Sequence, residues 1–173
     1  DVITFGFAPS AMVFSLLASP TAAVILPLSI VSCAWVIADY VPYVGLVMAA
    51  FSALRLAKFN LDERQALGFI GLPTPANALF WGALIVGTGG WLEKYVAILF
   101  CLLALSCYLL VSEVPMFALK FKHWGWAENK LKYIFVITSA LLLVVFRIPG
   151  IALVIAWYVL LSAFTQQRGT KVE

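Results

Sequence analysis

Three groups of residues in this sequence have types and spacings that could bind an anion and move a proton. Asp1 heads an apolar stretch and offers a carboxylate. Arg55 and Lys58 lie three residues apart in another apolar stretch, which puts both cations on one face of a helix. The segment from Gly71 to Pro75 is a tight turn that opens a further apolar stretch. Together these groups suit a phosphate-bearing substrate, with the carboxylate left for metal or proton work.

The elements that must position these residues follow from composition. Of 173 residues, 64% are hydrophobic and 11% are charged, whereas an ordinary soluble domain is roughly half apolar and a quarter charged. The apolar stretches approach the length of about 20 residues that a membrane span needs. The sequence therefore predicts an all-α fold, a polytopic transmembrane helical bundle of about six spans, with a single membrane domain over residues 1–173. A net charge of +3 is too small to indicate a nucleic-acid partner.

The apolar stretches also give the order and orientation of the helices. They are residues 2–18, 22–38, 40–59, 75–89, 94–112, 131–146 and 149–165. Six crossings bring nine of the eleven basic residues to one side, with Asp1 beside them and Lys94 and Arg147 opposite. Because Lys and Arg are enriched in cytoplasmic loops, that side is expected to be cytoplasmic. Residues 22–38 are then re-entrant, interfacial or continuous with a neighbouring helix, since a full extra span would separate Asp1 from Arg55.

A stripe of small residues marks the stretch 40–59. Gly45, Ala49, Ala53 and Ala57 recur at every fourth position. Small side chains let helix backbones approach closely, and packing drives helix association in lipid. The stripe therefore predicts a close helix contact along this span, which is a structural role.

The candidate site residues also have interpretations without catalytic function. Long cations near the end of a span extend their charged tips to the interface, and Arg55 and Lys58 could do only that. Arg55, a turn deeper, fits this interpretation less well. Asp1 could be a solvated residue at a helix N-terminus, where the helix dipole favours a negative charge. Glu113, near the end of the stretch 94–112, could pair with a lysine.

Three motifs in the first half of the chain resemble those of the CDP-alcohol phosphotransferase family, in its phosphatidylserine synthase branch. Asp1 and the following V-I-T-F-G-F-A-P-S are similar to the end of the family signature, in which D-G-x-x-A-R precedes G-x-x-x-D-x-x-x-D, and Asp1 matches the last Asp. The segment L-R-L-A-K-F-N at 54–60 resembles L-R-L-A-R-F-N, with Lys58 in place of Arg. The segment F-I-G-L-P-T-P-A-N at 69–77 resembles F-x-G-L-P-x-P-A. The later spans fit the family by hydropathy only.

The resemblance implies an activity and a set of site residues. The activity is transfer of a phosphatidyl group from CDP-diacylglycerol to the hydroxyl of L-serine, which gives phosphatidylserine and CMP. Asp1 would be the general base and a metal ligand. The residues implied at the substrates are Arg55, Lys58, Asn60, Gly71 and Pro73. Which cation would meet a phosphate and which the serine carboxylate does not follow from the sequence.

The resemblance also implies a cofactor, a location and partners. Family members bind two divalent cations, Mg²⁺ or Mn²⁺, through four acidic residues, of which three would lie upstream of Asp1. We therefore expect the chain to be an N-terminally truncated part of an enzyme and to be inactive by itself. The implied location is the bacterial cytoplasmic (inner) membrane, as a multi-pass protein in the lipid bilayer with its active site facing the cytoplasm. Family members are often dimers, so a homodimer is implied as well.

Two other functions are consistent with the sequence. Another member of the same family would use glycerol phosphate or inositol as its acceptor alcohol, and the segments V-I-T-F-G-F-A-P and G-L-P-T-P favour serine by resemblance only. A transporter or a membrane scaffold is the alternative from another class, because transporters often pair interrupted helices in two halves. Pro20 and Pro27, with Pro73 and Pro75, fit that pattern loosely. Sequence upstream of Asp1 discriminates, since a transporter would not carry D-G-x-x-A-R there.

Overall fold

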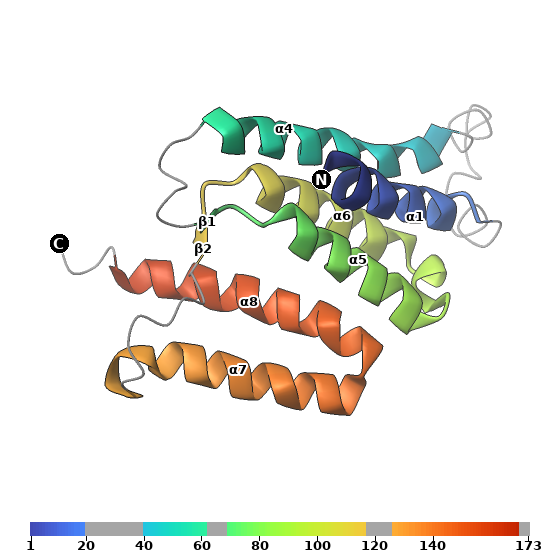
Figure 1. Ribbon diagram of the computed structural model, residues 1–173. Coiled ribbons are helices and arrows are strands. Elements are labelled where there is room, and N and C mark those ends of the chain that lie inside the picture. Colours follow the sequence, from blue (N-terminus) through green and yellow to red (C-terminus); the bar gives the residue numbers. More distant parts are fainter. Residues whose placement is uncertain (20–39, 62–68, 117–125, 170–173) are drawn as a thin grey trace.

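Six α-helices make up most of the computed structural model, which describes residues 1–19, 40–61, 69–116 and 126–169 (Figure 1). They are α1 (Ala8–Leu17), α4 (Val47–Leu61), α5 (Thr74–Thr88), α6 (Val96–Val111), α7 (Trp126–Phe146) and α8 (Ile148–Gly169). Short helical turns lead into three of them: η1 (Val2–Phe7) into α1, η2 (Val41–Leu46) into α4 and η4 (Trp91–Lys94) into α6. The predicted all-α fold is confirmed. The stretch 22–38 lies outside the described residues.

Proline and glycine explain several helix boundaries. Pro9 has no N–H for the Phe5 carbonyl and its ring would collide with that carbonyl, so the chain is wound more widely over η1 than in an α-helix. Pro75 lies in the first turn of α5, where an N–H would have no partner. Gly89 and Gly90, both with positive φ, end α5.

A two-residue antiparallel ladder ties two of the connections together. Strand β1 (Phe69–Ile70) pairs with β2 (Pro115–Met116), with Phe69 opposite Met116 and Ile70 opposite Pro115. Because β1 precedes α5 and β2 follows α6, the start of α5 and the end of α6 meet at one end of the bundle. We call this the ladder end; it also holds the end of α4 (Figure 1).

The helices are arranged so that charged residues separate between the two ends. Arg55 and Lys58 lie in the last turns of α4, towards the ladder end. Lys94, in η4, and Arg147, between α7 and α8, lie at the opposite end (Figure 1). Helices α5 and α6 occupy the middle of the bundle, with α1 and α4 on one side and α8, then α7, on the other. For the described basic residues, this is the separation that the charge pattern predicts.

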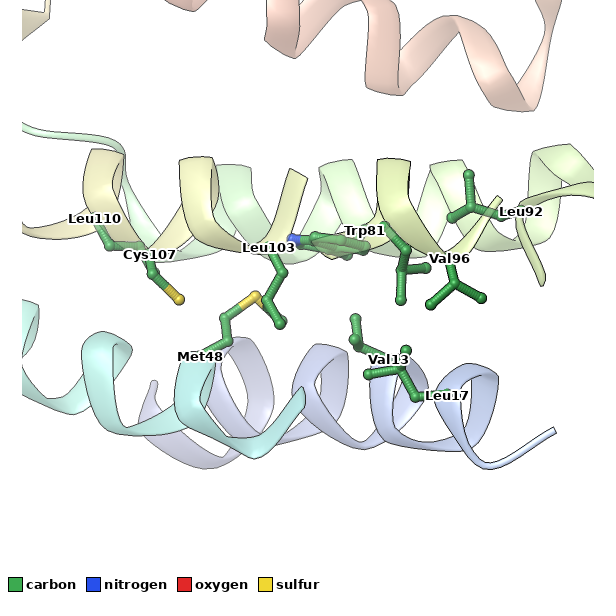
Figure 2. Close-up of a cluster of buried hydrophobic side chains, with 10 residues drawn as sticks. Val13, Leu17, Met48, Trp81, Leu92, Val96, Leu103, Cys107 and Leu110 are labelled. Atoms are coloured by element: carbon green, nitrogen blue, oxygen red, sulfur yellow. The ribbon is translucent and has the colours of Figure 1, made fainter. Parts of the chain in front are cut away.

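The buried apolar core lies between α1, α4, α5 and α6 (Figure 2). Trp81 of α5 is fully buried, and its indole Nε1 donates a hydrogen bond of 3.1 Å to Oγ of Ser106 on α6. Satisfying that indole N–H within the core fixes α5 against α6. The members of the cluster are Val13, Leu17, Met48, Trp81, Leu92, Val96, Leu99, Leu103, Cys107 and Leu110.

The antiparallel contact between the first helix and α4 depends on two glycines. A Cβ on Gly6 would lie 2.9 Å from Cβ of Ser52, and a Cβ on Gly45 would lie 2.8 Å from the backbone N of Phe14. Both distances are too short for a side chain, so the two helices approach closely at these points. The start of the chain thus lies beside α4 (Figure 1).

The small-residue stripe accounts for only part of this contact. Gly45 packs on α1, but Ala53 and Ala57 are exposed, while Met48 and Ser52 are buried instead. Steps of four residues on a helix of 3.6 residues per turn drift by about 40° each. The stripe therefore rotates away from its neighbour, so that Gly45 makes a close approach while Ala53 and Ala57 face outward.

One helix among the described residues, Val41–Leu61, is long and apolar enough to cross a membrane by length and composition. Four shorter apolar helices accompany it: Val2–Leu17, Val96–Val111, Lys132–Phe146 and Ile148–Ala163.

Candidate functional site

Arg55 is turned into the bundle by the helical period of α4. Met48, Ser52 and Arg55 follow one another at intervals of four and three residues, and all three are buried. Only 7% of Arg55 is exposed. Its guanidinium carbon lies 5.9 Å from the centroid of the Phe59 ring, one turn further on. A side chain that carries a permanent charge is therefore almost wholly removed from solvent, with an aromatic ring beside its guanidinium.

The Nε atom of Arg55 is buried and has no hydrogen-bond partner among the described residues. A buried donor without an acceptor costs free energy, and more when the group is charged. An anionic ligand would remove this cost, because a guanidinium binds phosphate or carboxylate through parallel hydrogen bonds. Arg55 thus has the burial and the free donor that an anion-binding residue needs.

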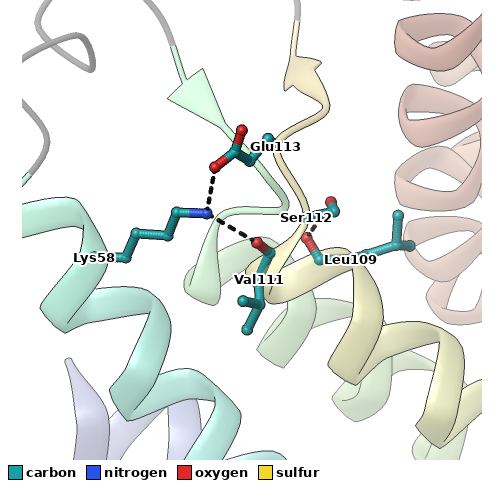
Figure 3. A network of polar contacts seen from close by, with 5 residues as sticks. All are labelled: Lys58, Leu109, Val111, Ser112 and Glu113. Atoms are coloured by element: carbon teal, nitrogen blue, oxygen red, sulfur yellow. Dashed lines mark hydrogen bonds and ion pairs between the residues drawn. The ribbon is translucent and has the colours of Figure 1, made fainter.

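Lys58 has partners within the protein (Figure 3). Its Nζ lies 2.9 Å from Oε1 of Glu113, in an ion pair with a hydrogen bond, and donates a second, longer bond of 3.4 Å to the carbonyl oxygen of Val111. Val111 is the last residue of α6. Although Lys58 and Arg55 are neighbours on α4, the two cations therefore have different surroundings.

The turn before α5 docks on the same end of α6. The N–H of Gly71 donates to the carbonyl of Val114 at 2.9 Å, and the N–H of Leu72 donates to the carbonyl of Leu109 at 3.0 Å. Gly71 has φ +75°, and a Cβ there would lie 2.7 Å from the carbonyl oxygen of Ser112. Glycine is required here by conformation and by space. The N–H of Gly71 is thereby used inside the protein.

Pro73 and two buried polar residues form the start of α5. Pro73 is the residue before the first helical turn, with extended backbone angles, and no side chain caps the helix. Thr74 and Asn77, which the motif 69–77 contains, are buried. The amide Nδ2 of Asn77 donates to Sδ of Met48 at 3.3 Å, and its Oδ1 has no partner among the described residues. Neither side chain was among the predicted site residues, although their three-residue spacing on α5 is a signal for one shared face.

Asp1 and Asn60 are the two candidate residues that are exposed. The Asp1 carbonyl accepts the N–H of Phe5 at 2.8 Å. Asn60 lies in the last turn of α4, close to Leu61. The candidate residues other than Asp1 therefore lie towards the ladder end, and Lys58 and the turn at Gly71 share one direct anchor, the end of α6.

The described residues do not by themselves fit a two-cation site. No group of three or more His, Cys, Asp or Glu side chains in the described part of the chain could hold a metal ion. Asp1 offers one carboxylate, and Glu113 is paired with Lys58. Mg²⁺ and similar cations require several oxygen ligands, which these two residues do not supply.

No family model, curated protein or solved structure matches this chain.

Proposed function

We propose that the complete protein transfers the phosphatidyl group of CDP-diacylglycerol to L-serine. The observation that carries the proposal is Arg55, a buried cation whose Nε has no partner among the described residues. It lies on α4 towards the ladder end, where α5 begins. The three motifs that resemble the CDP-alcohol phosphotransferases contain these same residues.

The proposed setting is a lipid bilayer that several of the helices cross. Support comes from the distribution of side chains, since large apolar residues cover the outside and polar ones are buried inside. On α7, Leu141, Val144 and Val145 are each more than 60% exposed, whereas Ser52 and Asn77 are fully buried. In water the exposed surface would be costly, and in lipid it is the expected arrangement.

The shorter helices can be accommodated in this setting. Helix α6 has 16 residues, so its axis is about 24 Å long at a rise of 1.5 Å per residue. The hydrocarbon core of a bilayer is about 30 Å thick. A span that is a few ångströms short is accommodated by local thinning of the bilayer at modest cost. The membrane proposal therefore includes bilayer thinning around this bundle.

The proposed reaction is a displacement at the phosphorus that bears diacylglycerol. The serine hydroxyl oxygen forms a bond to that phosphorus, the bond to the CMP oxygen breaks, and CMP leaves. The hydroxyl proton passes to the Asp1 carboxylate, which acts as general base. Arg55 holds an anionic group of a substrate, a phosphate or the serine carboxylate, and so fixes its position for attack. Both roles are assigned to residues of this chain and include no divalent cation, because the described residues do not fit a two-cation site.

The test uses the complete protein, including whatever sequence lies upstream of Asp1. Membranes that contain it should convert CDP-diacylglycerol and labelled L-serine to phosphatidylserine and CMP. Asp1→Asn should abolish turnover. Product with glycerol phosphate or inositol but not with serine would move the protein to another acceptor. Absence of any phosphatidyl product, with the protein folded, would refute the enzyme proposal.

A further inference from the structure

We propose that Glu113 is a positioning residue, which holds Lys58 in a clasp between α4 and the end of α6. The clasp comprises Lys58, Glu113 and the Val111 carbonyl. In this arrangement Lys58 does not contact substrate, and Arg55 alone of the two cations binds the anion. The expected effect of the clasp on activity rests on the proposed function. The contacts that form the clasp do not depend on that function.

The end of α6 attracts a cation for two reasons. The last four carbonyls of a helix have no partner within it, and Val111 carries one of them. The aligned peptide dipoles also leave a partial negative charge at that end. Nζ of Lys58 lies where both effects act, 3.4 Å from the Val111 oxygen, and Glu113 adds a full negative charge at 2.9 Å (Figure 3).

Two segments of the site are anchored to this one helix end. Lys58 attaches α4 to it, and the N–H groups of Gly71 and Leu72 attach the turn that precedes α5. The position of Arg55 relative to the start of α5 therefore depends on both attachments. Loss of the clasp would free the last turns of α4 while leaving the turn before α5 in place.

The charge of Glu113 also argues against direct substrate binding by Lys58. A carboxylate 2.9 Å from Nζ compensates the lysine charge and would repel a phosphate that approached the same atom. The pair is partly exposed, with 36% of the Lys58 side chain and 66% of the Glu113 side chain accessible. Exposed ion pairs contribute little to global stability, so the expected consequence is in positioning.

A charge exchange distinguishes a clasp from a substrate contact. In the complete protein, Lys58→Glu and Glu113→Lys each place two like charges together, and each should reduce kcat/KM at least about tenfold. The double variant Lys58→Glu/Glu113→Lys restores an ion pair and should recover activity to within about threefold of the wild type. If Lys58 touches the anionic substrate, the double variant will be at least as poor as Lys58→Glu, and the proposal is overturned.

A second measurement tests the clasp without using activity. A carbodiimide condenses a lysine amine with an adjacent carboxylate, taking up the lost water and leaving an amide bond. Treatment of the folded complete protein should give a Lys58–Glu113 crosslink in mass spectrometry, and Lys94 should give none with Glu113. If folded protein yields no crosslink between Lys58 and Glu113, the clasp is refuted. Protein that gives the crosslink on treatment but makes no phosphatidylserine before treatment would instead refute the proposed function and leave the clasp standing.

Discussion

Arg55 and Lys58 lie three residues apart on one helix, yet the structure gives them opposite surroundings. Nζ of Lys58 is 2.9 Å from the Glu113 carboxylate, while Nε of Arg55 is buried and has no hydrogen-bond partner among the described residues. The difference follows from helix geometry. A step of three residues turns the helix by about 300°, so the two side chains diverge by about 60°. Arg55 points into the bundle, and Lys58 reaches the end of α6.

Arg55→Lys tests the role of the buried guanidinium. Lysine keeps the charge and the apolar stem but cannot reproduce two parallel hydrogen bonds. We expect kcat/KM of the complete enzyme to fall at least about tenfold, which is roughly 1.4 kcal/mol of transition-state stabilisation. Lys58→Arg is the matched control and should be mild, because arginine can also pair with Glu113. Full activity of a well-folded Arg55→Lys protein would show that Arg55 serves only as an anchor at the interface.

Cysteine labelling tests the membrane topology. In a background without the native cysteines, Asn60→Cys should be labelled from the cytoplasm and Lys94→Cys from the opposite side, because they lie at opposite ends of the bundle. Both native side chains are exposed, whereas Leu92 is 3% exposed and would label poorly. Arg147→Cys serves as a second site on the side of Lys94. Labelling of residues 60 and 94 from the same side would contradict the proposed topology.

The helices could be predicted from the sequence because apolar runs and prolines act locally. The predicted stretch 75–89 is α5 within one residue, since Pro75 and the glycines at 89 and 90 mark its ends. Lys130 and Lys132 lie near the start of α7 and Arg168 lies near the end of α8, so each is separated from Arg147 by the length of a helix. The position of Arg147 at the end opposite to these residues was therefore also predictable. These properties depend on neighbouring residues and on chain length.

Contacts between distant residues could not be predicted in the same way. The sequence suggested a lysine partner for Glu113, but five lysines were closer to it in sequence than Lys58 is. The choice depends on how α4 and α6 pack, which no local pattern encodes. Gly71 was expected at the substrate from its motif. The structure shows that its N–H is bonded to Val114 and its Cα lies against α6, a role that only the fold reveals.

A double-mutant cycle tests the close approach of η1 to α4. Gly6→Ala places a Cβ 2.9 Å from Cβ of Ser52 and should lower the free energy of unfolding by about 1–3 kcal/mol. Ser52→Gly removes the opposing Cβ at a cost of about 1 kcal/mol. We expect the double variant to be less destabilised than the sum of the two, by at least about 0.5 kcal/mol.

Gly45→Ala is the control for this cycle. Its new Cβ would meet the backbone of Phe14, 2.8 Å from the nitrogen. No side-chain truncation can relieve that contact, so Phe14→Gly should not rescue Gly45→Ala. Thermal unfolding in detergent gives all the values. Strict additivity of Gly6→Ala and Ser52→Gly would mean that the two helices do not meet at these residues.

Gly71→Ala tests whether the turn before α5 needs glycine for its conformation, for its space, or for both. The structure offers two matched glycines: Gly82 lies in α5 with nothing within 4 Å of an added Cβ, and Gly89 has φ +53° with open space around it. Gly82→Ala should stabilise the protein by up to about 1 kcal/mol, through helix propensity. Gly89→Ala should cost about 1–2 kcal/mol, from the left-handed conformation alone.

Gly71→Ala should be the most damaging of the three. Its φ of +75° carries the same conformational cost, and the new Cβ would lie 2.7 Å from the backbone oxygen of Ser112, which the hydrogen bonds of the turn hold in place. We expect a loss of more than about 2 kcal/mol, which at this chain length lowers Tm by roughly 4–8 °C. Because the turn and Lys58 share the end of α6, Gly71→Ala should also raise KM for the anionic substrate, and Gly89→Ala should not. Equal losses of stability for Gly71→Ala and Gly89→Ala would show that the turn does not pack on α6.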